Sequence, residues 1–117
     1  MALDPTGKYV ALAGYEQQNW NPVIGAIQVF ELQPDGKFIA EGAPILTPGV
    51  TTLTSVRWDG SGHVYAVGQQ QNGGKCQDGG SACGLYIFNL TPNGLVQAAG
   101  SPHQIDDPVD VAVLPAK

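Results

Sequence analysis

Two cysteines are the residues of this chain whose type and spacing point most directly to chemistry. Cys76 and Cys83 lie in the glycine-rich segment KCQDGGSACG, with six residues between them. A disulfide here would close a short loop and restrain the unfolded chain by roughly 2 to 3 kcal/mol. This spacing, taken with the positions of His63 and His103, matches no zinc-binding pattern, so no metal site is expected. The alternative to a disulfide is two unrelated free thiols. We prefer the disulfide, which predicts an oxidising compartment, periplasmic or extracellular.

His103 is the only candidate for acid–base catalysis that the sequence suggests. It lies in GSPHQIDDP, close to Asp106, Asp107 and Asp110. A neighbouring carboxylate raises the pKa of an imidazole and can orient it as a general base. The alternative is an ordinary polar turn. The three aspartates lack the EF-hand ligand spacing and its final glutamate, so they do not predict a calcium site. His63 directly follows a turn and is expected to be solvated.

Trp20 is the candidate binding residue. It lies in the long segment EQQNWNPV, where an aromatic ring flanked by Gln and Asn would form a platform for a carbohydrate or a peptide. The sequence contains no Gly-x-Ser-x-Gly elbow, phosphate-binding glycine loop or dinucleotide fingerprint. We therefore expect no cofactor.

The amino-acid composition limits the fold classes and the kinds of partner that the chain can have. Only 13% of the 117 residues are charged, and there are 16 glycines and 9 prolines, a balance typical of short strands joined by turns in one domain. The net charge is −5 and the few basic residues are scattered, which argues against a nucleic-acid partner. No apolar run approaches the roughly 20 residues of a membrane helix, and the residues ALDPTGKYV after Met1 predict no signal peptide in this chain.

An internal repeat organises the chain. QPDGKFIAEGAP (33–44) returns as TPNGLVQAAGSP (91–102), and GAIQVFEL (25–32) returns as CGLYIFNL (83–90), both at a spacing of 58. KYVALAGY (8–15), after the turn DPTG, returns as HVYAVGQQ at a spacing of 55, after the turn DGSG. In both turns the Asp side chain and the glycine favour a tight reversal. The alternating strands and these turns predict consecutive antiparallel hairpins.

The repeated unit has four strands, because LTSVRW (53–58) precedes the second copy and the similar VDVAVL (109–114) ends the chain. Four-stranded antiparallel units with shifted ends are typical of β-propeller blades. We expect an all-β partial propeller of two four-stranded sheets. Blade one covers residues 1–52 and provides strands 2 to 4, and blade two covers 53–108. Residues 109–114 either complete blade one or remain an unpaired start of the next blade. The alternative is a small β-sandwich.

The repeated turn and strand motifs resemble those of the seven-bladed lactonase-like propellers. The pattern is Asp-x-Ser/Thr-Gly-Lys-aromatic-Val, Ile-x-Val-Phe-x-Leu, Pro-Asp/Asn-Gly, Gly-Ser-Pro and Pro-x-x-Val-Ala-Val, and it spans Asp4 to Pro115. This family includes bacterial 6-phosphogluconolactonases of the propeller type, fungal muconate-lactonising enzymes and secreted YVTN-type repeat proteins. The resemblance implies a fragment of a bacterial enzyme that hydrolyses a sugar lactone such as 6-phosphogluconolactone. The rival interpretation is a non-catalytic propeller module for binding or scaffolding.

The resemblance covers turn and core positions rather than catalytic ones. Catalytic members of the family place His, Arg and Glu side chains near the central channel, and no local motif here matches them. Arg57 is the single arginine, so a phosphorylated substrate would find little to bind. We expect the isolated chain to be inactive. Two blades cannot close a ring, since propellers use roughly 4 to 8. The expected partners are therefore the remaining blades of a longer parent, or further copies of this chain in a closed ring.

Overall fold

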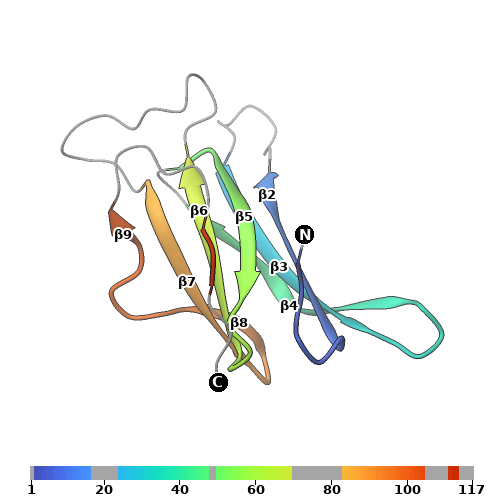
Figure 1. Cartoon of the computed structure of the whole chain (residues 1–117). Coiled ribbons are helices and arrows are strands. Elements are labelled where there is room, and N and C mark those ends of the chain that lie inside the picture. The colour runs from blue at the N-terminus through green and yellow to red at the C-terminus, as the bar shows by residue number, and fades with distance from the viewer. Residues whose placement is uncertain (1, 17–23, 48–49, 70–82, 105–110, 114–117) are drawn as a thin grey trace.

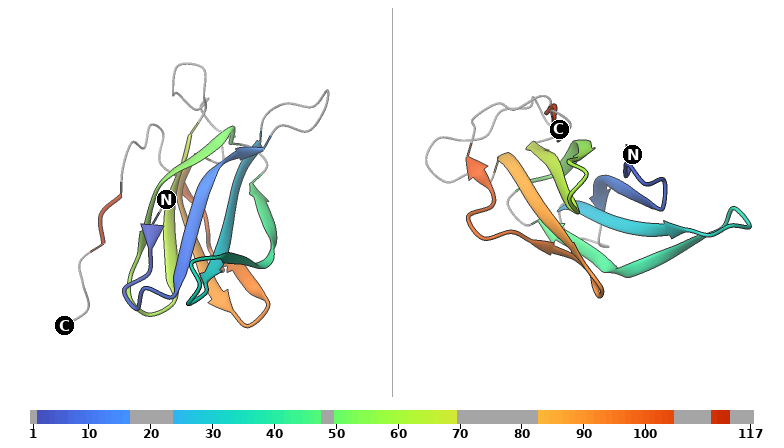
Figure 2. Two further views of the ribbon diagram at one scale, coloured as in Figure 1. Left: turned by 90° about the vertical axis from the view of Figure 1, so that its right-hand side faces the viewer. Right: turned by 60° about the horizontal axis from the view of Figure 1, so that its bottom comes forward.

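The computed structural model describes residues 2–16, 24–47, 50–69, 83–104 and 111–113, and these form strands and turns with no helix. Sheet A is antiparallel, with the order β1 (Ala2–Leu3), β2 (Tyr9–Glu16), β3 (Ile24–Leu32) and β4 (Phe38–Thr47). Sheet B has the order β5 (Thr52–Trp58), β6 (His63–Gln69), β7 (Gly84–Thr91) and β8 (Gly94–Gln97), and the short β9 (His103–Gln104) also pairs with β7. The prediction of an all-β chain with two four-stranded antiparallel sheets is confirmed. Figures 1 and 2 show the two sheets side by side.

Aspartate side chains build the turns that start both sheets. Lys8 N and Tyr9 N donate to Asp4 Oδ1 at 2.9 and 2.8 Å. In sheet B, Ser61 N donates to Asp59 Oδ1 at 2.7 Å and His63 N donates to it at 3.1 Å. A side-chain oxygen that accepts backbone N–H groups fixes a tight reversal and so sets the register of the strand that follows.

The core lies between the two sheets. Successive side chains of a strand point to opposite faces of its sheet. In each sheet, we call the face that points toward the other sheet the inner face, and the opposite face the outer face. The inner face of sheet A carries Ala11, Ile27 and Val29, and that of sheet B carries Val64, Ala66, Tyr86 and Phe88. All of these side chains are at most 2% exposed. Fully burying a side chain of the size of Val or Phe stabilises a fold by about 1.5 to 3 kcal/mol. This contact is therefore the main source of stability.

At one corner the sheets touch through backbone alone. A Cβ on Gly42 of β4 would lie 2.6 Å from the carbonyl oxygen of Asn93, and a Cβ on Gly94 of β8 would lie 2.6 Å from that of Glu41. Both glycines have positive φ, at +79° and +111°. No other residue type fits this approach without moving the strands apart.

The register of the two sheets differs from the sequence alignment by one residue. Val10 pairs with Phe30 in sheet A, and Val64 pairs with Phe88 in sheet B. Val10 is therefore equivalent to Val64 at a spacing of 54 (64 minus 10), and not to Tyr65 as the spacing of 55 predicts.

The difference arises in the turns. The β1–β2 turn closes with Asp4 N donating to the carbonyl of Tyr9, five positions on, whereas the β5–β6 turn closes from Asp59 N to His63, four positions on. The turn of sheet A therefore holds one residue more. The β3–β4 hairpin is also longer by one residue than the β7–β8 hairpin, because Leu32 pairs with Phe38 and Leu90 pairs with Leu95.

Ala2 and Leu3 occupy the place beside β2 that residues 109–114 would take if they completed blade one, the first of the two alternatives given above. Ala2 pairs with Ala11 and Leu3 pairs with Val10, so β1 lies beside β2. Of the segment 109–114, only 111–113 belong to the described part of the chain, and they form no strand. Val111 N donates to Ser55 Oγ of β5 at 3.3 Å. Residues 111–113 therefore contact sheet B, and the two alternatives for the whole segment 109–114 stay predictions, because 109, 110 and 114 lie outside the described residues. A local hairpin through the Asp4 turn fills the position beside β2.

Candidate functional site

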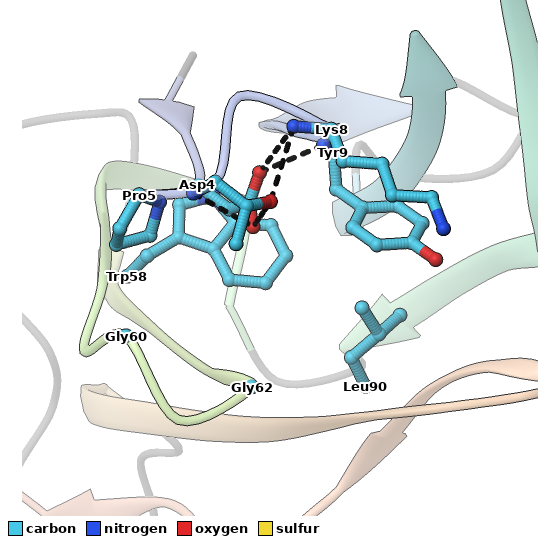
Figure 3. Close-up of a pocket in the computed structure, with 9 residues that line it drawn as sticks. Asp4, Pro5, Lys8, Tyr9, Trp58, Gly60, Gly62 and Leu90 are labelled. Carbon is cyan, nitrogen blue, oxygen red and sulfur yellow. Dashed lines mark hydrogen bonds between the residues drawn. The ribbon is translucent and has the colours of Figure 1, made fainter.

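A pocket of about 410 Å³ lies where the two aspartate turns meet (Figure 3). The residues that line it come from both turns and from the ends of β2, β5 and β7; they are Asp4, Pro5, Thr6, Lys8, Tyr9, Trp58, Gly60, Gly62 and Leu90. Because equivalent turns lie at the same end of each sheet, the repeat itself creates this hollow. It combines polar and aromatic groups.

Trp58 determines the shape of this pocket. Its indole lies between the Asp4 turn and the turn that contains Gly60 and Gly62 (Figure 3). Trp58 Nε1 donates to the carbonyl oxygen of Ala2 at 3.0 Å, which links the end of β5 to β1. The ring also packs against the core. Trp58 therefore packs between the two repeats.

The carboxylate of Asp4 is occupied by the turn. Oδ1 accepts two backbone N–H groups, and Oδ2 accepts the hydroxyl of Thr6 at 2.6 Å. Desolvation alone would raise the pKa of Asp4, but the hydrogen bonds from Thr6, Tyr9 and Lys8 together hold that pKa below its usual value of 3.8. Asp4 is therefore a fixed anion that stabilises the turn rather than an acid–base group.

The rest of the pocket wall is mainly apolar. Lys8 Nζ lies 5.3 Å from the centroid of the Tyr9 ring, within the range of a cation–π interaction. Trp58, Leu90 and Pro5 provide the apolar surface. The pocket thus offers aromatic and apolar contact with one ammonium group, and its lining includes no nucleophile paired with a base.

Asp59, His63 and Tyr65 form a polar cluster in the second turn. His63 Nδ1 lies 2.6 Å from Asp59 Oδ2, and the Tyr65 hydroxyl donates to the same oxygen at 3.3 Å. The side chain of His63 is 42% exposed. Desolvation raises the pKa of Asp59, but its hydrogen bonds from Ser61 and His63 and the charge of His63 outweigh this and lower the pKa. Desolvation and then the Asp59 charge raise the pKa of Tyr65.

This pair was missed in the sequence analysis, which treated His63 as a solvated turn residue. The available signal was the aspartate four residues before the histidine in DGSGH, since the same turn that accepts His63 N also brings the imidazole to the carboxylate. Carboxylate-oriented imidazoles occur in general-base catalysis. Here the carboxylate also caps the turn, which gives it a structural role.

Of the residues selected from the sequence, His103 and Cys83 belong to the described part of the chain. His103 lies in β9, pairs with Leu85 and is exposed. Asp106, Asp107 and Asp110 lie outside the described residues, as does Trp20, so the proposed histidine–carboxylate pair and the binding role of Trp20 stay predictions. Cys83 is fully buried in the core, whereas Cys76 lies outside the described residues, so their disulfide stays a prediction as well.

No group of three or more His, Cys, Asp or Glu side chains in the described part of the chain is arranged to hold a metal ion. No helix within the described ranges has the length and apolar character of a membrane span. Comparison of the chain with protein-family models, with curated proteins and with solved structures found no match.

Proposed function

We propose that this chain is a non-catalytic repeat module, formed by two consecutive β-propeller blades that stack on further sheets of the same kind. The proposal rests on one observation, namely that the two sheets contact each other through non-equivalent faces. Val10 and Phe30 of sheet A are equivalent to Val64 and Phe88 of sheet B, because each pair occupies the same register position. Val64 and Phe88 lie on the inner face of sheet B, whereas Val10 and Phe30 lie on the outer face of sheet A.

The two sheets therefore meet through non-equivalent faces. The inner face of sheet B corresponds to the outer face of sheet A, so one sheet follows the other head to tail. A twofold-related pair of repeats would bury the same face of each sheet. Head-to-tail contacts repeat until a ring closes, which is how propeller blades are arranged. This supports the blade interpretation over the small β-sandwich.

The pocket chemistry also favours a module for scaffolding or binding. The Asp4 carboxylate is used by its turn, and the pocket walls are mostly aromatic and apolar. Such surfaces suit packing or the binding of a ligand more than they suit hydrolysis.

Hydrolysis of a sugar lactone, such as 6-phosphogluconolactone, is the second candidate, for a longer propeller that includes these blades. The observation in its favour is the Asp59–His63 pair, since an oriented imidazole can activate water. A phosphorylated substrate would need cationic groups from other blades, because Arg57 is the only arginine in the sequence. Incubating the chain with this lactone, beside a His63→Ala variant, should reveal no hydrolysis above that of the variant.

A tandem fusion tests the module proposal. Two copies of the chain joined by a flexible linker should unfold at a higher denaturant concentration than one copy, because a new interface between sheets forms. A self-contained sandwich would have no such interface, and the fusion would then unfold at the midpoint of the single copy. That result would refute the module.

A further inference from the structure

We propose that the outer face of sheet A is a docking surface for a second copy of this chain, which covers it with the outer face of its own sheet B. The inference rests on the proposed function, and it names the partner that covers the outer face of sheet A. The docking surface consists of Val10, Leu12, Phe30 and Phe38.

This surface is a shallow apolar hollow. Val10 and Phe30 are cross-strand partners, and Leu12 and Phe38 flank them on β2 and β4, around a depression of about 150 Å³. Val10 is only 6% exposed and forms the floor, whereas Leu12 is 43% and Phe38 is 56% exposed. A contiguous hollow lined only by aliphatic and aromatic side chains is a feature of interaction surfaces.

Sheet B shows how such a surface is covered. The register makes Val64, Ala66, Phe88 and Leu95 the equivalents of the four residues of the docking surface, in the same order. Val64, Ala66 and Phe88 are fully buried, and Leu95 packs against the core. The face that covers them is the inner face of sheet A.

The matching cover for sheet A is therefore a surface equivalent to its inner face. Ala11, Ile27 and Val29 correspond by register to Tyr65, Leu85 and Ile87, which lie on the outer face of sheet B. These three side chains are half-buried, and they surround Val67, which is 2% exposed. Each outer face thus has a small buried valine between larger apolar side chains.

The outer face of sheet B cannot reach the docking surface of its own chain. The docking surface and its matching cover lie on opposite sides of the two-sheet stack, because the inner faces are already in contact. A second copy can offer its sheet B to the sheet A of the first, and this repeats the contact that exists inside each chain. The interface is heterologous, so closed rings of whole copies would contain an even number of sheets.

Sedimentation velocity over a concentration series of the full chain is the test. The wild-type chain should associate, and Leu12→Glu should weaken association by about a hundredfold, because the interface would bury an unpaired carboxylate. Phe38→Glu, at a more exposed position, provides a second variant if Leu12→Glu does not fold. Ile39→Glu is the matched control: Ile39 is a 54% exposed apolar residue of the same sheet, and it lies outside the docking surface. It should associate as the wild type does.

A mixing experiment identifies the occupant. Leu12→Glu blocks the sheet A surface, and Ile87→Glu or Leu85→Lys blocks the cover on sheet B. Each variant alone should remain monomeric, while an equimolar mixture should form a heterodimer, because one intact surface of each kind remains. A wild-type chain that is monomeric throughout, an Ile39→Glu variant that loses association, or a mixture that stays monomeric would each overturn the proposal. Since the tandem fusion does not require separate copies to associate, its stabilisation can survive this failure.

Discussion

Gly68 faces the ring of Tyr86 on the inner face of sheet B. A Cβ at position 68 would lie 2.5 Å from Tyr86 Cε1 and 3.2 Å from a methyl group of Val50. Tyr86 in turn stacks on Phe88, with the ring centroids 6.3 Å apart and the ring planes 13° apart. The missing side chain at position 68 thus leaves the space in which these two stacked rings are packed.

Gly68→Ala should destabilise the fold by about 1 to 3 kcal/mol, because the added methyl group must displace a buried aromatic ring. Urea unfolding followed by far-UV circular dichroism measures this change. Gly14→Ala is the matched control, since Gly14 is the register equivalent of Gly68 (68 minus 54) and a Cβ there would meet nothing within 4 Å. Its effect should be within about 0.5 kcal/mol of zero. Equal losses for the two variants would contradict the packing described here.

Tyr86 should ionise only at strongly alkaline pH. Burial raises its pKa from 10.0 to about 12, because the phenolate would lose its hydration. The folded protein therefore holds this proton where the unfolded chain releases it, so stability should be intact below pH 10 and should fall as the pH rises from 10 toward 12. Urea unfolding at several alkaline pH values tests this. Tyr86→Phe should make that decline shallower, and an unchanged decline would assign it to other groups.

The two turn aspartates should make the fold acid-sensitive. The pKa values of Asp4 and Asp59 are both lowered in the folded state, so their contribution is complete above the usual value of 3.8 and is lost as the pH falls through the folded pKa. Asp59→Asn should lower stability at neutral pH by about 1 kcal/mol and flatten the acid side of the profile. Asp35→Asn is the comparison, since Asp35 accepts one backbone N–H in an exposed hairpin. A profile as steep in Asp59→Asn as in the wild type would contradict this account.

Cys76 and Cys83 should be disulfide-bonded in protein purified without reductant. Alkylation of the denatured, unreduced chain followed by mass spectrometry should find neither cysteine modified, and prior reduction should expose both. Cys83 is fully buried, so denaturation is needed for the reagent to reach it. Modification of both cysteines without reduction would favour the free-thiol alternative.

The sequence predicts the strands and their turns well because these depend on local chemistry. The Asp4 and Asp59 turns and the alternation in β3 and β7 are each encoded within about ten residues. The one-residue difference in turn length is not visible in the letters, because DPTG and DGSG align without a gap. It is resolved only by which carbonyl the first N–H of the turn reaches, at Tyr9 or at His63.

The candidate site is predicted less well for a related reason. The Asp59–His63 contact depends on the exact path of the turn, and the pocket depends on Trp58 reaching the carbonyl of Ala2, 56 positions earlier in the chain. Neither of these two contacts produces a periodic pattern of residues that could be recognised in the sequence. A one-residue shift also exchanges the two faces of a strand, so the open apolar surface at Leu12 and Phe30 could be assigned only once the register was known.

The glycine contact at the corner of the sheets has a consequence for sequence drift. Gly42 and Gly94 are 52 positions apart in the chain (94 minus 42). Yet neither position has room for a side chain, because the backbone next to the other glycine fills the space. Core positions such as Val29 or Val64 can exchange one aliphatic residue for another. At Gly42 and Gly94, by contrast, every other amino acid would add a side chain that does not fit. Among descendants that keep both sheets, this glycine pair should outlast the apolar residues around it, and the two positions should be lost together rather than one at a time.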